Sequence, residues 1–168
     1  MKKELLQELR QLLAAERVLS LGVLRDGNPY VGLLPYVVAR DFSCVFIHAS
    51  RLALHSAGLV EGARFSVMIH GPVSSDSDPL QIQRVTLDGS IGQIARDSRD
   101  YVVVRGMYVE RFPTSARTFE LGDFSLYRLR FDGGRYVGGF ARARSLGPKD
   151  IEALGTGPEE GPPAKRES

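Results

Sequence analysis

The sequence has few of the residues that build covalent or metal-bound scaffolds. It contains one cysteine, Cys44, and three histidines. A single cysteine cannot form an intramolecular disulfide or a cysteine cluster for zinc or iron–sulfur, which indicates a reducing, cytoplasmic setting. His48, His55 and His70 would have to converge from two strands and a helix to bind zinc, so no metal site is expected.

Long apolar runs and blocks of one charge are also absent. No stretch of about 18 apolar residues occurs, and the N-terminus leads into a periodic leucine pattern rather than a signal-peptide core. We therefore expect neither secretion by a signal peptide nor membrane spanning. The net charge is +2 with basic and acidic side chains interspersed, so nucleic-acid binding is not indicated. The common signatures of nucleotide-binding proteins, zinc proteases and serine hydrolases are missing.

The elements that are present predict a mainly β protein. With 168 residues, 43% of them apolar, the chain can form one domain with its own core. Leucines at helical spacing predict an opening helix over 1–16, and further helices are predicted over 51–60 and 97–111. Strands are predicted at 18–24, 30–39, 44–49, 65–69 and 81–94, followed by a hairpin of 124–131 and 135–140 around Asp132-Gly133-Gly134.

This order of elements predicts an α+β fold built on a six- to seven-stranded antiparallel barrel with flanking helices, over residues 1–146. The turn Asp26-Gly27 joins the first two strands, and Gly89 and Gly92 predict a bend or bulge in the long strand. Residues 147–168 are rich in glycine, proline and charge and lack aromatic residues, so a disordered C-terminal tail is predicted.

The end of the third predicted strand carries a candidate anion site. Ser50 and Arg51 place a hydroxyl and a guanidinium where a strand meets the predicted helix, and free N–H groups and the helix dipole there favour a phosphate. The alternative interpretation is structural: Ser50 caps the helix, and Arg51 is a solvated residue of its first turn.

Several motifs, taken in order, resemble those of one family. They are Asp26-Gly27-Asn28-Pro29-Tyr30-Val31, Ser50-Arg51-Leu52-Ala53-Leu54-His55, residues 83–89, residues 123–129 and residues 137–143. Spread over roughly residues 15–146, they are similar to the pyridoxamine 5′-phosphate oxidase-like, FMN-binding split β-barrel family, and most of all to its haem-utilisation (HugZ-like) branch.

The resemblance implies a homodimer with FMN between the subunits. The phosphate would lie against Ser50 and Arg51, and the flavin ring edge against the main chain of 31–34. The implied cofactor-binding residues are Val31, Gly32, Leu33, Leu34, His48, Ser50, Arg51, His55, Gln83 and Arg84. Structural alternatives stay open: Gln83 and Arg84 as solvent-facing strand residues, and His55 as a histidine hydrogen bonded to a carbonyl.

The implied function is that of a flavoprotein oxidoreductase acting on a small-molecule substrate, in which the flavin supplies the chemistry and no catalytic residue is assigned. The alternatives are a non-catalytic flavin or haem binding protein for storage, delivery or sensing, a haem-utilisation protein, or a barrel that has lost its cofactor and serves as an interaction domain.

The sequence departs from the family pattern in residues for substrate binding and for iron binding. Pro35 stands where pyridoxamine phosphate oxidases have a lysine, and the chain has no tryptophan. Haem-degrading members use a histidine in a C-terminal extension as an iron ligand, whereas no histidine follows His70 here. An iron ligand would have to be a tyrosine, a methionine or one of the three histidines.

Overall fold

The computed structural model describes residues 3–76, 78–139 and 142–156. Its helices and strands are α1 (Lys3–Ala15), β1 (Val18–Arg25), β2 (Asn28–Val38), β3 (Cys44–Ser50), β4 (Arg64–His70), β5 (Arg84–Ile94), α2 (Arg99–Arg111), β6 (Phe124–Val137), β7 (Ala143–Leu146) and α3 (Pro148–Gly155). Short 3₁₀ helices cover Leu54–Gly58, Pro79–Gln81 and Pro113–Glu120. None of the helices in the described part of the chain is long and apolar enough to cross a membrane.

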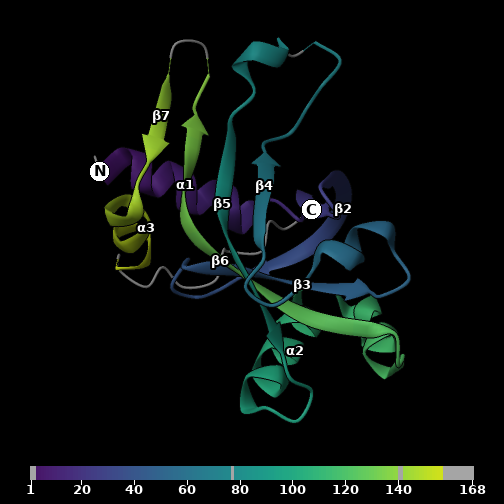
Figure 1. The fold of residues 1–168 in the computed structure, drawn as a ribbon. Coiled ribbons are helices and arrows are strands. Elements are labelled where there is room, and N and C mark those ends of the chain that lie inside the picture. The colour runs from purple at the N-terminus through teal and green to yellow at the C-terminus, as the bar shows by residue number, and fades with distance from the viewer. Residues whose placement is uncertain (1–2, 77, 140–141, 157–168) are drawn as a thin grey trace.

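The strands form a closed antiparallel barrel (Figure 1). The strand order is β3-β2-β1-β4-β5-β6-β7, and β3 also pairs with β6, so that six strands close on themselves and β7 extends β6. Every pairing is antiparallel. The predicted antiparallel split barrel is confirmed.

The hairpin between β1 and β2 follows from its turn residues. Asp26 and Gly27 both adopt positive φ, 50° and 77°, and Arg25 pairs directly with Asn28. Two left-handed residues give the turn whose twist matches that of the flanking strands, so the Asp-Gly pair fixes the register of both strands.

Residues 132–134 do not form the predicted turn. β6 continues through them to Val137, and the pairing of β5 with β6 shifts register between Asp88 and Gly89. A Cβ atom on Gly134 would lie 2.1 Å from the carbonyl oxygen of Thr86, so the glycines permit close approach of two strands rather than a reversal. β7 pairs antiparallel with this end of β6, and Ala143 lies opposite Val137.

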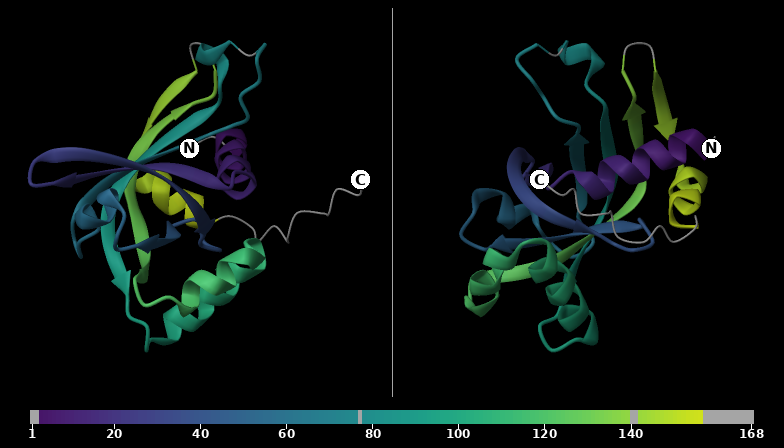
Figure 2. Two further views of the ribbon diagram at one scale, coloured as in Figure 1. Left: turned by 90° about the vertical axis from the view of Figure 1, so that its right-hand side faces the viewer. Right: turned by 180° about the vertical axis from the view of Figure 1, so that it is seen from behind.

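The core has two parts. One fills the barrel and includes residues of α1 and α3, such as Leu13 and Leu154. The other lies between α2, the 3₁₀ segment Pro113–Glu120 and the outer face of β3, where Phe46 and Tyr108 are buried. Figures 1 and 2 show α1 and α3 side by side and α2 at the opposite end of the barrel. β3 is therefore buried on both faces.

Two other predicted segments also differ from the structure. Residues 51–60 do not form an α-helix: β3 runs to Ser50, and only the 3₁₀ helix Leu54–Gly58 follows. The predicted disordered tail begins with an ordered helix, α3, whose apolar Ile151 and Leu154 are buried against the barrel and α1. Residues 157–168 of that tail lie outside the described residues.

Candidate functional site

One outer face of the barrel carries exposed apolar side chains that no helix of the described residues covers. Side chains alternate along each strand, so β1 points Leu19, Leu21 and Val23 inward. Residues paired across strands share a face: Leu33 opposes Ser20, which opposes Met68, and Val31 opposes Gly22, which opposes Ser66. We call this surface the open face; its outward residues are Val18, Ser20, Gly22, Leu24, Val31, Leu33, Pro35, Ser66 and Met68.

The apolar side chains of the open face are strongly exposed. Val31 is 76% and Leu33 70% accessible, and Leu24 and Met68 are exposed beside them. A contiguous exposed apolar surface of this kind is typical of a binding site for a ligand or a partner. Val31 and Leu33 therefore lie where a ligand can reach them, whereas Gly32 and Leu34 point into the barrel and are buried.

His55 packs against the inner side of β2. A Cβ atom on Gly32 would lie 2.5 Å from Nδ1 of His55, so only glycine leaves room for the ring. Nε2 of His55 is buried and hydrogen bonds to none of the described residues. Burial lowers the pKa of His55. The structure thus brings two of the expected site residues, Gly32 and His55, into contact.

Ser50 and Arg51 are engaged with the segment before β6. Ser50 Oγ donates a hydrogen bond to the Asp123 carboxylate at 2.6 Å and accepts one from the Leu52 N–H at 3.2 Å. The Arg51 guanidinium donates to the Gly122 carbonyl at 2.8 Å. Since no α-helix begins at Ser50, the helix dipole on which the predicted anion site depended is absent there, and that premise is wrong.

His48 lies inside the second core. Its ring stacks on Phe119 with centroids 3.9 Å apart, and Nδ1 is 3.2 Å from Oγ1 of Thr118. The residue is only 5% accessible. Burial, helped by the positive charge of Arg96, lowers the pKa of His48 to about 4, so the ring is neutral near pH 7.

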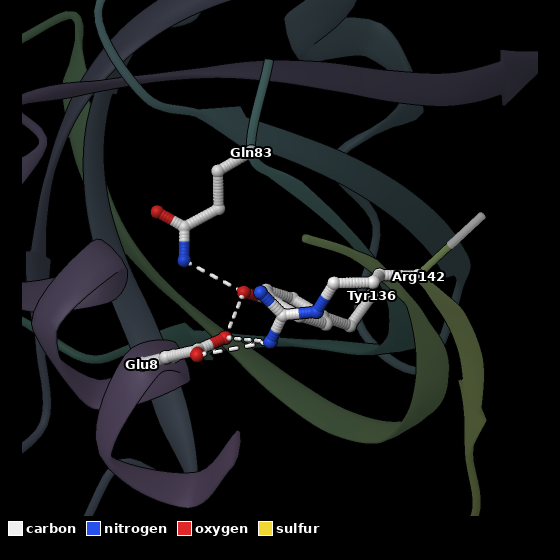
Figure 3. A network of polar contacts seen from close by, with 4 residues as sticks. All are labelled: Glu8, Gln83, Tyr136 and Arg142. Atoms are coloured by element: carbon white, nitrogen blue, oxygen red, sulfur yellow. Dashed lines mark hydrogen bonds and ion pairs between the residues drawn. The ribbon is translucent and has the colours of Figure 1, made fainter. Parts of the chain in front are cut away.

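Gln83 belongs to a polar network with Tyr136, Glu8 and Arg142 (Figure 3). The Gln83 amide donates to the Tyr136 hydroxyl at 2.7 Å, and that hydroxyl donates to the Glu8 carboxylate at 2.6 Å. Arg142 adds an ion pair to Glu8 at 3.0 Å. The hydrogen bond from Tyr136 lowers the pKa of Glu8. This network connects α1 with the residue before β5, with β6 and with the segment before β7.

Arg84 lies at the edge of the open face. It pairs with His70 of β4 and donates a hydrogen bond to the Ile82 carbonyl at 3.0 Å. Beside it, a shallow pocket of about 250 Å³ is lined by Gly71, Pro72, Asp78, Gln81, Ile82 and Gln83. Its lining comes from the connection between β4 and β5, which projects beyond the barrel (Figure 1).

The predicted site residues therefore lie in separate places within one chain: the open face and its edge, the inner side of β2, the end of β3, the second core and the Tyr136 network. Sequence reasoning missed Asp123 and Tyr136 as the partners of Ser50 and Gln83, because nothing in the pattern shows pairings over 73 and 53 residues. In the described part of the chain, no group of three or more His, Cys, Asp or Glu side chains is arranged to hold a metal ion.

The closed barrel with an added strand is the split β-barrel of the pyridoxine phosphate oxidase-like proteins. A protein of that family from Clostridium acetobutylicum superposes with a TM-score of 0.64 at 12% identity, over 90% of this chain and 99% of its own. No family model matches the chain.

Within this fold, the sequence is similar to proteins of haem utilisation. HutZ of Vibrio cholerae, described as a haem oxygenase, is 27% identical over 149 residues, which are 86% of this chain and 82% of HutZ. A crystal structure of HutZ, described there as a haem storage protein, is 25% identical, with a TM-score of 0.67 over 74% of this chain and 88% of that one.

A haem-binding protein from Mycobacterium smegmatis is 26% identical, with a TM-score of 0.79 over 91% of this chain. This chain spans only 62% of the length of the mycobacterial protein. Together these similarities confirm the resemblance to the haem-utilisation branch of the split barrels.

Proposed function

We propose that this chain is a haem-binding protein of haem utilisation that holds haem on the open face, between two copies of the chain. The observation that carries this proposal is the exposed apolar surface around Val31 and Leu33. The haem macrocycle is flat and largely apolar, and binding it there would remove both the ring and these side chains from water.

The chemistry of the open face suits a haem ligand. Its centre is apolar or small, because Ser20 lies between Leu33 and Met68, and Gly22 lies between Val31 and Ser66. Arg84 at the edge supplies a guanidinium that can pair with a propionate. Bound haem would supply iron redox chemistry, while the chain would exclude water from the ring and orient it.

The similarity to HutZ and to the mycobacterial haem-binding protein supports haem as the ligand. It favours haem over the FMN implied by the sequence motifs. The geometry at Ser50 also weighs against FMN, because the Asp123 carboxylate occupies the hydroxyl that a phosphate would use and would repel that anion.

A second copy of the chain is the proposed cover for the open face. Exposed apolar patches on an isolated barrel are costly, and a symmetric dimer buries the same patch on both copies. A haem bound at that interface would be enclosed by two open faces, which is the arrangement we propose for the complete site.

The test is a titration of the purified chain with haemin, followed by the Soret absorbance and repeated in excess FMN. We expect one haem site that FMN does not compete for, and loss of binding in Val31→Lys. Val102 provides the matched control, since it is 69% exposed on α2, away from the open face, and Val102→Lys should bind haem normally. Equal binding by both variants, or displacement by FMN, would contradict the proposal.

A further inference from the structure

The three histidines of the chain differ in how exposed their ring nitrogens are. Nε2 of His48 and Nε2 of His55 are both buried, and the His48 ring is stacked on Phe119. His70, at the end of β4, is exposed. Only His70 can meet a ligand of haem size on the surface without opening a packed core.

The His70 ring is held in one tautomer. Nδ1 lies 2.8 Å from the Gly71 carbonyl, which can only accept, so Nδ1 carries the proton. Nε2 then has a free lone pair, and none of the described residues hydrogen bonds to it. A histidine whose Nδ1–H is fixed by a carbonyl is the form in which imidazole binds a metal through Nε2.

The position of His70 places that lone pair beside the open face. Outward residues alternate along β4, so Ser66, Met68 and His70 share one side of the strand. Arg84 lies directly opposite His70 on β5. An imidazole, an apolar surface and a guanidinium therefore meet at one corner of the open face.

Other side chains that bind haem iron are less accessible in the described residues. Five of the six tyrosines, Tyr36, Tyr101, Tyr108, Tyr127 and Tyr136, are buried, and Tyr30 packs on the barrel core. Cys44 is also buried. Met107 is partly buried against the second core, away from the open face. Met68 is therefore the competing methionine, two residues from His70 on the same face.

We propose that the imidazole of His70, through Nε2, would bind the iron of a haem held on the open face. This assignment rests on the proposed function. Arg84 beside it would hold a haem carboxylate, so that His70 and Arg84 together set the position and orientation of the ring.

The experiment compares haem complexes of the wild-type chain, His70→Ala and Met68→Leu. Absorbance and electron paramagnetic resonance of the ferric complexes, and the iron–imidazole band in the resonance Raman spectrum of the ferrous complex, report the ligand directly. We expect the imidazole signature in the wild type and in Met68→Leu and its loss in His70→Ala, with a fall in haem affinity of about tenfold or more.

Added imidazole should restore the histidine-type spectrum of His70→Ala, which a purely structural effect of the substitution would not allow. Circular dichroism of the variant serves as the folding control, and His70→Gln gives a second substitution at the same exposed position. An unchanged spectrum in both His70 variants, or a signature lost in Met68→Leu, would overturn the assignment while haem binding itself stands. A wild-type chain that binds no haem would overturn both proposals.

Discussion

At the scale of single residues, Gly89 shows how tightly two strands approach. A Cβ atom at this position would lie 1.7 Å from the carbonyl oxygen of Arg130, a backbone atom that cannot move without disturbing the pairing of β5 with β6. We predict that Gly89→Ala lowers the free energy of unfolding by about 1–3 kcal/mol, the usual cost of forcing a backbone shift in a packed region.

Gly106 is the matched control for that substitution. It lies on the exposed side of α2, and a Cβ atom there would meet nothing within 4 Å. Gly106→Ala should raise the free energy of unfolding by about 0.5–1 kcal/mol, because alanine favours the helix. Urea denaturation of both variants checks the pair, and equal effects would refute the close-approach explanation.

His48 should make the stability of the protein depend on pH. Its pKa in the folded chain is about 4, against an ordinary value near 6.5, so the unfolded chain binds the proton more tightly. The contribution of neutral His48 is fully present above about pH 6.5 and is lost as the pH falls toward 4. Arg96 works with burial in this direction, and Asp123 opposes it.

The measurement is the free energy of unfolding at several pH values between 7 and 4, for the wild type and for His48→Phe. Phenylalanine keeps a ring against Phe119 but cannot titrate. The variant should lose less stability on acidification than the wild type. Parallel curves for the two proteins would show that the pKa of His48 is not lowered by folding.

At the scale of elements, one arginine of α1 forms hydrogen bonds to the end of α3. The Arg10 guanidinium on α1 donates to the Leu154 carbonyl at 2.7 and 3.0 Å and to the Ala153 carbonyl at 3.3 Å, at the end of α3. These are carbonyls that a helix end leaves without partners, and a cation there also suits the helix dipole.

We predict that Arg10→Leu speeds hydrogen exchange of the α3 amides several-fold while leaving the barrel strands unchanged, because the helix loses its cap but keeps the buried Ile151 and Leu154. Gln11→Leu, at the exposed neighbouring position of α1, is the control. Exchange measured by mass spectrometry distinguishes the two. Unchanged protection of α3 in Arg10→Leu would mean that the apolar contacts alone hold it.

Elements with a local signal could be predicted from the sequence. The periodic leucines gave α1, and Asp26-Gly27 gave the hairpin of β1 and β2, because a helical face and a left-handed turn need only neighbouring residues. The glycines at 133 and 134 misled for the same reason. Locally they favour a turn, but their role is set by their pairing with Leu87 and Asp88 of β5, which are distant in the sequence.

The site was harder to predict than the fold. Ser50 and Arg51 have the residue types of a phosphate site, and only the folded chain reveals that Asp123 and Gly122 occupy them. The open face also required the structure, since exposure of Val31 and Leu33 depends on where α2 packs. Composition in 147–156 suggested disorder, whereas Ile151 and Leu154 bury enough apolar surface to order a helix.

At the scale of the whole molecule, the open face predicts self-association. We expect a particle of about twice the 18.5 kDa mass of one chain, because burying two copies of the same apolar patch is favourable. Light scattering of the wild type checks the mass. Leu33→Lys should give a single-chain mass, while a lysine at Val103, which is exposed on α2, should leave the dimer intact. A wild-type mass of one chain would exclude the covered haem site.

Closure of the barrel depends on one pairing that is distant in the sequence, between Cys44–Ser50 and residues 124–130. During synthesis, β1 to β5 emerge first, and the edge of β3 that will pair with β6 has no partner. The barrel cannot close until most of β6 has left the ribosome. Such late, non-local pairing slows folding and leaves a strand edge open to other chains. Chain termination before Phe124 would therefore produce an open, aggregation-prone sheet rather than a smaller barrel.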